Sequence, residues 1–112
     1  MKKIEAIIRE ESFEEVKAAL EAESYFGMTV SEVIGRGRQK AIPVQQRAGE
    51  YWVDLLPKIK IELVVLDEDV AAAVDAIVRK SRTGEVGDGK IFIIPVEGVV
   101  RIRTGDQDEN AI

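Results

Sequence analysis

A glycine-rich run that ends in lysine is the part of this sequence best suited to binding an anion. Residues 83–90 read Thr-Gly-Glu-Val-Gly-Asp-Gly-Lys and nearly match the phosphate-binding pattern of glycine, four residues, glycine and lysine. Glycines let backbone N–H groups converge on phosphate oxygens, and Lys90 adds positive charge there. The match is incomplete, because Ile91 replaces the hydroxyl residue that holds magnesium in hydrolases and a strand is predicted to follow. Taken alone, such a run is more often a simple turn.

Two other groups of cations also suit an anionic ligand. Residues 35–40 read Gly-Arg-Gly-Arg-Gln-Lys, which can bring backbone donors and guanidinium groups to a carboxylate or phosphate. Arg101 and Arg103 flank one apolar residue, so in an extended segment their side chains lie on one face and could reach one polyphosphate. They could instead be surface arginines that balance the acidic residues of 106–109. The cations of 79–82 are better explained as charges at a helix C-terminus.

The composition is that of an ordinary globular protein and excludes several kinds of site. The 112 residues suit a single domain, 1–112, and 46% of them are hydrophobic. Without cysteine or histidine, the chain lacks disulfides, thiolate metal sites and the commonest general base. The formal charge of −5 argues against a surface built for nucleic-acid phosphates. With no apolar run of roughly 18 residues and no signal peptide, we expect a cytoplasmic protein.

The first half of the chain predicts strand, helix and strand, followed by a long loop. Residues 3–9 form a mostly buried strand, and Ser12 with Glu15 makes a capping box for a helix that runs to about residue 23. Residues 28–34 are a second β-type run. The segment from 39 to about 50 has no sustained period and contains proline and glycine, which predicts a long exposed loop.

The second half repeats this order. A strand is predicted from Tyr51 to Val65, with Pro57 at a bend or an edge position, and Asp67 is expected to cap a second helix. Residues 90–94 form a hydrophobic strand, and 99–103 could add a short one. Two βαβ halves predict an α+β, ferredoxin-like fold, with an antiparallel sheet and both helices on one face.

Several of these runs resemble the P-II signal proteins in identity, order and spacing. The runs are 35–40, 47–51, 56–62, 83–92 and 100–105, and the resemblance covers essentially the whole chain, including its last two residues. It implies a regulatory homotrimer, not an enzyme, with three sites for ATP or ADP in clefts between neighbouring subunits. It also implies an exposed partner-binding T-loop at about 37–55 and a C-terminal segment at about 101–112.

The resemblance also implies which residues bind the nucleotide. Residues 87–90 would hold phosphates together with Arg38 of the same chain, while Arg101 and Arg103 would lie across the cleft. Thr29 and Val64 would line the adenine side. The full expected set is Thr29, Gly35, Gly37, Arg38, Val64, Gly87, Asp88, Gly89, Lys90, Arg101 and Arg103.

Members of the family also bind 2-oxoglutarate beside magnesium and ATP. At matching positions Gln39 would help to hold the metal and Lys58 would pair with a carboxylate, with Lys40 in the same site. The sequence departs from the family pattern at two places: Ala41 stands where glycine is common, and Arg-Glu at 9–10 replaces the frequent Lys-Pro. If position 41 needs a positive φ, alanine there would weaken 2-oxoglutarate binding.

The T-loop implies partners and a modification site. In relatives it docks on ammonium transporters or nitrogen-metabolism enzymes, and Arg47 at its tip would enter a transporter's cytoplasmic mouth. Tyr51 matches the tyrosine that is uridylylated in some relatives, although a packing role at the start of a strand has equal weight. Residues 42–46 differ from the usual loop, which leaves the partner open; other members regulate nitrogenase or carbon uptake. A slow ATP hydrolase and an RNA-binding module are the rival functions.

Overall fold

The computed structural model describes residues 1–37, 42–46, 49–53 and 55–112, with side chains described for 1–37 and 55–112. Its main sheet contains β1 (Lys2–Ile8), β2 (Thr29–Gly35), β5 (Leu56–Val65) and β6 (Gly89–Pro95) in the order β2-β5-β1-β6. All neighbouring strands are antiparallel. This order confirms the ferredoxin-like α+β prediction, because each helix connects two parallel strands that are separated by one other strand.

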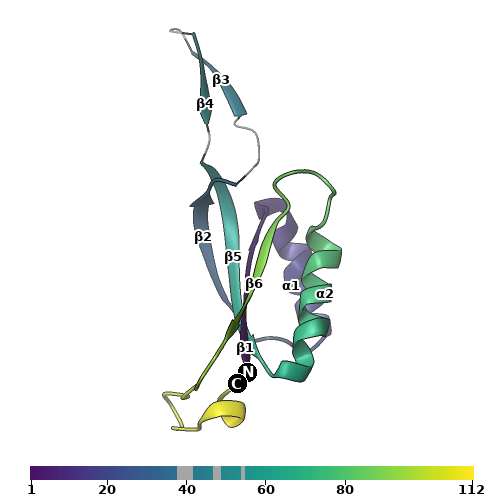
Figure 1. Cartoon of the computed structure of the whole chain (residues 1–112), viewed down its shortest axis with the longest axis vertical. Helices are drawn as coiled ribbons and strands as arrows, with labels where there is room; N and C mark the ends of the chain where they lie inside the picture. The colour runs from purple at the N-terminus through teal and green to yellow at the C-terminus, as the bar shows by residue number, and fades with distance from the viewer. Residues whose placement is uncertain (38–41, 47–48, 54) are drawn as a thin grey trace.

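Both helices cover the same face of the sheet (Figure 1). α1 (Phe13–Ala22) lies between β1 and β2, and α2 (Val70–Ser81) lies between β5 and β6. Alternate residues of β1 and β5 are buried beneath the helices, which contribute their own apolar residues. Burial of each large aliphatic side chain contributes about 1.5–3 kcal/mol. The core consists of Ile4, Ala6, Ile8, Val16, Leu20, Ile59, Ile61, Leu63, Val65, Ala73, Ala76 and Ile77.

The two predicted helix caps are wrong. A 3₁₀ turn, η1 (Glu10–Ser12), leads into α1, so Ser12 already has helical φ and ψ and its side chain makes no capping hydrogen bond. An N-cap residue needs extended backbone to turn its oxygen toward the helix. Asp67 likewise belongs to a 3₁₀ turn, η2 (Asp67–Asp69), before α2. Its carboxylate accepts a hydrogen bond from the α-ammonium group of Met1 at 2.9 Å.

The segment predicted as a long loop contains a β-hairpin. β3 (Ile42–Gln46) pairs antiparallel with β4 (Gly49–Val53), so the predicted strand from 51 to 65 is divided between β4 and β5. The hairpin extends beyond the four-stranded sheet (Figure 1). Pro57 lies near the start of β5, opposite Ile34 of β2 and before the residues that pair with β1, which confirms its predicted edge setting.

The C-terminal segment forms a turn and ends in a 3₁₀ helix, η3 (Asp108–Ala111). Among the described residues of this segment, the only β-type pairing is an isolated bridge between Val100 and Gln107. Residues 102–104 form the turn between these two residues. The backbone N–H of Gly105 donates to the Arg101 carbonyl at 2.8 Å. The predicted strand over 99–103 is therefore wrong, and so is the argument that placed the two arginines on one face of it.

None of the helices in the described residues covers the other face of the sheet. Cross-strand ion pairs cover part of this open face, of which the shortest joins Lys3 Nζ to Glu62 Oε2 at 2.6 Å. Phe92 and Ile94 of β6 lie on the same face and remain 46% and 39% exposed. No helix in the described part of the chain is long and apolar enough to cross a membrane.

Candidate functional site

The glycine-rich run forms a tight loop between α2 and β6. Gly84, Gly87 and Gly89 have φ values of +89°, +106° and +113°, a region that other residues rarely adopt. At Gly89 the backbone also approaches β1 so closely that a Cβ would lie 1.8 Å from the Ile7 carbonyl oxygen. The glycine at position 89 is therefore required by the fold, and it fixes the point at which the loop meets the sheet.

The Asp88 carboxylate holds the loop closed from within. It accepts hydrogen bonds from the backbone N–H groups of Thr83 at 2.8 Å and Gly84 at 2.9 Å, and from the Thr83 hydroxyl. These bonds hold the pKa of Asp88 well below its usual range. A carboxylate with a depressed pKa stabilises the fold above its unfolded-state pKa, and this stabilisation is lost as the pH falls through the lower folded-state pKa.

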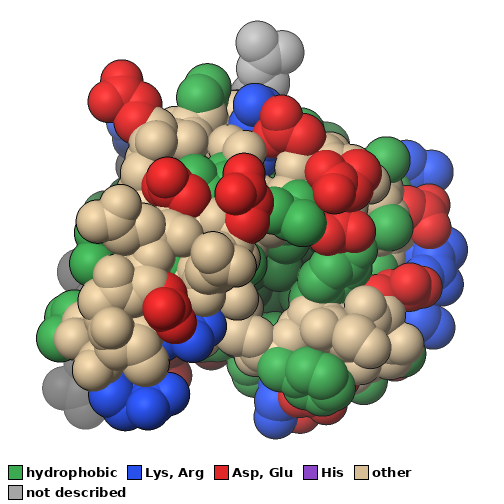
Figure 2. All heavy atoms as spheres, turned by 90° about the horizontal axis from the view of Figure 1, so that it is seen from below, with side chains coloured by type: hydrophobic (Ala, Val, Ile, Leu, Met, Phe, Trp, Pro, Cys, Tyr) green, Lys and Arg blue, Asp and Glu red, His purple; other side chains and the backbone are tan. Residues whose placement is uncertain are grey.

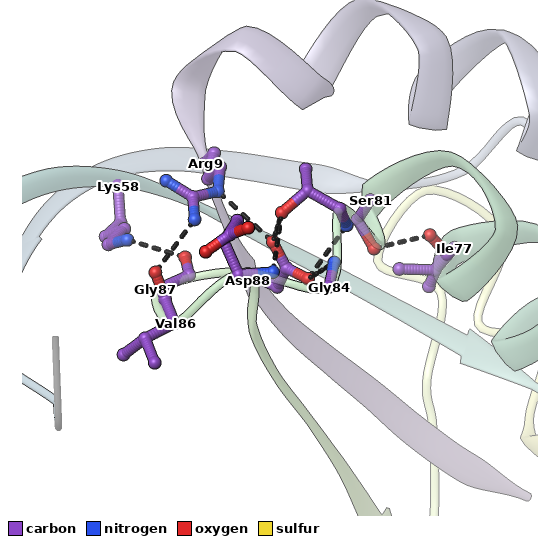
Figure 3. Close-up of polar contacts among 10 residues, drawn as sticks. Arg9, Lys58, Ile77, Ser81, Gly84, Val86, Gly87 and Asp88 are labelled. Atoms are coloured by element: carbon purple, nitrogen blue, oxygen red, sulfur yellow. Dashed lines mark hydrogen bonds and ion pairs between the residues drawn. The ribbon is translucent and has the colours of Figure 1, made fainter.

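Two cations approach the same loop from neighbouring strands (Figure 3). Arg9, directly after β1, donates from Nη2 to the Val86 carbonyl at 2.9 Å and from Nε to Asp88 Oδ1 at 3.3 Å. Lys58 of β5 donates from Nζ to the Gly87 carbonyl at 2.9 Å. Burial, together with the positive charge of Arg9, lowers the pKa of Lys58. The loop thus has cations on its carbonyl side.

Lys90 is the first residue after these glycines in β6 and is exposed. It pairs in register with Ile7 of β1. A loop with several positive-φ glycines and an exposed lysine at its end has the features of a backbone anion site. The described residues of the 35–40 run are Gly35, Arg36 and Gly37. They lie at the end of β2, where Gly35 pairs with Leu56 of β5, and this is the same end of the sheet as the glycine loop.

The residues expected on the adenine side lie at the opposite end of the sheet. Thr29 begins β2, and Val64 is near the end of β5. Both line a cavity of about 370 Å³ together with Lys3, Glu62 and the C-terminal residue Ile112. Figure 2 views this end of the molecule and shows a hollow with hydrophobic side chains in its depth and carboxylates around it.

Arg101 and Arg103 are also far from the glycine loop. Lys90 and Pro95 are separated by five steps along β6, about 17 Å of strand, and both arginines follow Pro95. Arg101 Nη1 lies 3.6 Å from Asp106 Oδ2, within the C-terminal turn. Within one chain, the structure therefore separates the expected site into a glycine-loop group and a group at the other end of the sheet (Figure 1).

Several expected site residues lie outside the described part of the chain. These are Arg38, Gln39, Lys40, Ala41 and Arg47; the side chain of Tyr51 is likewise not described.

Sequence reasoning missed the contacts of Arg9 with the loop. Arg9 entered the sequence argument only as a departure from a family pattern, whereas the structure joins it to Val86 and Asp88. The available signal was positional. Arg9 follows a strand and Asp88 precedes another, and antiparallel pairing of these strands brings the two residues together.

Comparison with known proteins identifies the family. Residues 1–106 match the family model for nitrogen regulatory protein P-II. The chain is 58% identical over 112 residues to nitrogen regulatory protein P-II 2 of Methanothermobacter thermautotrophicus, covering 100% of this chain and 97% of that protein. It is 55% identical, over the full length of both chains, to nitrogen regulatory protein P-II of Microchaete diplosiphon and of Cereibacter sphaeroides. The chain therefore belongs to the P-II family of nitrogen-regulatory signal-transduction proteins, whose members are regulators of nitrogen-metabolism proteins and not enzymes.

Proposed function

We propose that this protein senses cellular energy and nitrogen status in the cytoplasm by binding ATP or ADP, with the phosphates held at residues 87–90. The observation that carries the proposal is the shape of the glycine loop. Three glycines with positive φ lie within six residues, and exposed Lys90 follows the last of them. This arrangement suits a polyphosphate better than it suits a neutral ligand.

The peptide geometry of the loop fits phosphate binding. The carbonyls of Val86 and Gly87 point toward Arg9 and Lys58. In a trans peptide the N–H of the next residue points opposite to the carbonyl, so the N–H groups of Gly87 and Asp88 point away from these two cations. The proposed phosphate contacts come from these N–H groups and from Lys90. Asp88 takes part through its backbone, because its carboxylate holds Thr83 and Gly84.

We also propose a homotrimer in which each nucleotide lies between two subunits. Arg101 and Arg103 are too far from Lys90 to share a polyphosphate within one chain, and a neighbouring subunit can supply them. The open sheet face, with Phe92 and Ile94 partly exposed, offers apolar surface for such an assembly. Light scattering is expected to give three chain masses, consistent with closed cyclic symmetry. A monomer that binds ATP tightly would contradict the shared cleft.

The second proposed ligand is 2-oxoglutarate, held beside magnesium and ATP by Gln39, Lys40 and Lys58. Lys58 Nζ donates a hydrogen bond to the Gly87 carbonyl. A 2-oxoglutarate carboxylate that binds Lys58 would therefore bind an ammonium group that also contacts the glycine loop. Ionic pairing with a dicarboxylate compensates for the burial of this lysine.

Replacing Lys58 with methionine is expected to abolish 2-oxoglutarate binding, because the ammonium group is lost while most of the side-chain volume remains. Calorimetry in the presence of MgATP measures this loss, and Lys80→Met, which removes an exposed lysine of α2, is the matched control. Equal 2-oxoglutarate binding by the Lys58 variant, or by the unchanged protein without magnesium, would contradict the proposed site.

The proposed route to partners is the segment at about 37–55, which contains the β3–β4 hairpin. Arg47 would contact an ammonium transporter or a nitrogen-metabolism enzyme, and the membrane would be reached only through a transporter. Uridylylation of Tyr51 would add a bulky anion beside Arg47 and block docking. The alternative within the family is a regulator of nitrogenase or of carbon uptake.

One comparison separates these proposals from the rival functions. ATP and a generic RNA are titrated into the protein at equal salt, and the ATP sample is then analysed for products. We expect saturable ATP binding, no RNA binding and no catalytic turnover. Salt-sensitive RNA binding would favour a nucleic-acid module, whereas multiple turnovers of ATP would favour a slow hydrolase.

A further inference from the structure

We propose that Arg9 is a positioning residue that holds the glycine loop in its phosphate-binding shape without touching the nucleotide. The inference rests on the proposed nucleotide function, but its structural part concerns the free protein. Arg9 contacts the loop at two points, through the Val86 carbonyl and the Asp88 carboxylate (Figure 3).

The placement of Arg9 follows from the pairing of β1 with β6. Ile8, the last residue of β1, pairs with Gly89, the first residue of β6. One residue farther along, Arg9 and Asp88 lie opposite each other where the regular ladder ends. The backbone of Arg9 is therefore held next to the sheet, and its side chain is bound to the loop. Arg9 can thus hold the loop in a fixed position relative to the sheet.

The contacts are those of a partly buried charged group. The Arg9 side chain is 18% exposed and that of Asp88 is 24% exposed, so solvent screens their interaction less than it screens an ion pair on the open surface. A guanidinium group has several donors in one plane, and here two of them bind two different acceptors. A lysine at this position would have its donors on a single nitrogen atom, which would have to approach both acceptors at once to make both bonds.

The contacts also extend from Arg9 into the loop. Arg9 binds Asp88, and Asp88 binds the backbone N–H groups of Thr83 and Gly84, so one guanidinium group is connected to both ends of the loop. The bond from Arg9 to the Val86 carbonyl fixes the peptide that follows, whose N–H belongs to Gly87. Without Arg9, the Gly87 N–H, a proposed phosphate donor, would no longer be held in one orientation. Every residue proposed to contact the ligand would still be present.

The test compares Arg9→Gln, Arg9→Lys and the unchanged protein, with ADP as the probe and no dicarboxylate present. Calorimetry is expected to show about tenfold to hundredfold weaker ADP binding for Arg9→Gln and an intermediate loss for Arg9→Lys. In the nucleotide-free protein, amide hydrogen exchange at Thr83 and Gly84 is expected to rise by about tenfold in Arg9→Gln. The matched control is Arg79→Gln, which removes an arginine–aspartate bond of 2.9 Å on the surface of α2.

The two readouts distinguish failure of this inference from failure of the proposed function. If the unchanged protein binds no nucleotide, the proposed function fails and amide exchange alone decides whether Arg9 orders the loop. Unchanged amide exchange in Arg9→Gln would overturn the inference, even with weaker ADP binding, because Arg9 would then act as a direct ligand. Faster exchange with unchanged ADP affinity would also overturn it.

Discussion

Replacing Gly89 with alanine is expected to destabilise the folded protein by more than about 3 kcal/mol and to abolish nucleotide binding. The added Cβ would lie 1.8 Å from the Ile7 carbonyl oxygen, and the φ of +113° is itself unfavourable for alanine. Relief of the clash requires separation of β1 from β6 at the point where the loop ends and β6 begins. Thermal or urea unfolding of the variant measures the loss of stability.

Gly84→Ala is the matched control for this substitution. Gly84 also has a positive φ, +89°, but among the described residues no atom outside Gly84 and its two chain neighbours lies within 4 Å of the position that its Cβ would occupy. We expect a loss of about 1 kcal/mol, due to backbone strain alone. Equal stability losses at positions 84 and 89 would contradict the close approach of the loop to β1.

Replacing Lys90 with glutamine is expected to weaken both ATP and ADP binding by about a hundredfold, because a charge-assisted contact with phosphate is lost. Lys90 is exposed at the start of β6, so the fold and the assembly should be preserved. Calorimetry with each nucleotide measures the effect, and light scattering checks that the chain mass of the assembly is unchanged.

An exposed lysine elsewhere provides the control for this variant. Lys80 lies in the last turn of α2, and Lys80→Gln removes the same charge without altering the loop. Its nucleotide affinities should remain within about twofold of those of the unchanged protein. Unchanged ATP and ADP affinities in the Lys90 variant would exclude this lysine from the phosphate site.

The sheet and the helices could be predicted because burial follows a simple period. Alternation in β5 places Ile59, Ile61 and Leu63 against the helices, and spacing by helical turns buries Val16 and Leu20 in α1. Such patterns reflect the hydrophobic effect summed over many residues. A wrong assignment at one residue therefore does not change the predicted helix or strand. The order of the elements then restricts the topology to very few arrangements.

The secondary-structure predictions were wrong at positions where a single side chain or a single turn determines the local structure. Ser12 and Asp67 have the residue types of helix caps, but short 3₁₀ turns precede both helices and take these residues out of capping geometry. The apolar residues of 99–103 suggested a strand, whereas Gly105, with φ +75°, closes a turn there. The β3–β4 hairpin was not recognised because its strands lack clear alternation.

The glycine loop could be predicted from the sequence more easily than the spatial arrangement of the expected site residues. The glycine loop was recognised from glycine spacing, which reports local backbone geometry directly. The separation of Arg101 from Lys90 could not be read from the sequence, because it depends on where β6 ends and how the chain then turns. The role of Asp88 within the loop also needs coordinates, since its partners are backbone N–H groups.

Competition between nucleotides tests the central claim most directly, namely that each chain contributes one site that senses ATP against ADP. The protein is saturated with ADP, and ATP is then titrated in a calorimeter, with a direct ATP titration as the reference. We predict one ATP site per chain in the direct titration and an apparent ATP affinity that falls in proportion to the ADP concentration. ATP affinity that does not depend on ADP, or the absence of any nucleotide binding, would contradict the proposed function.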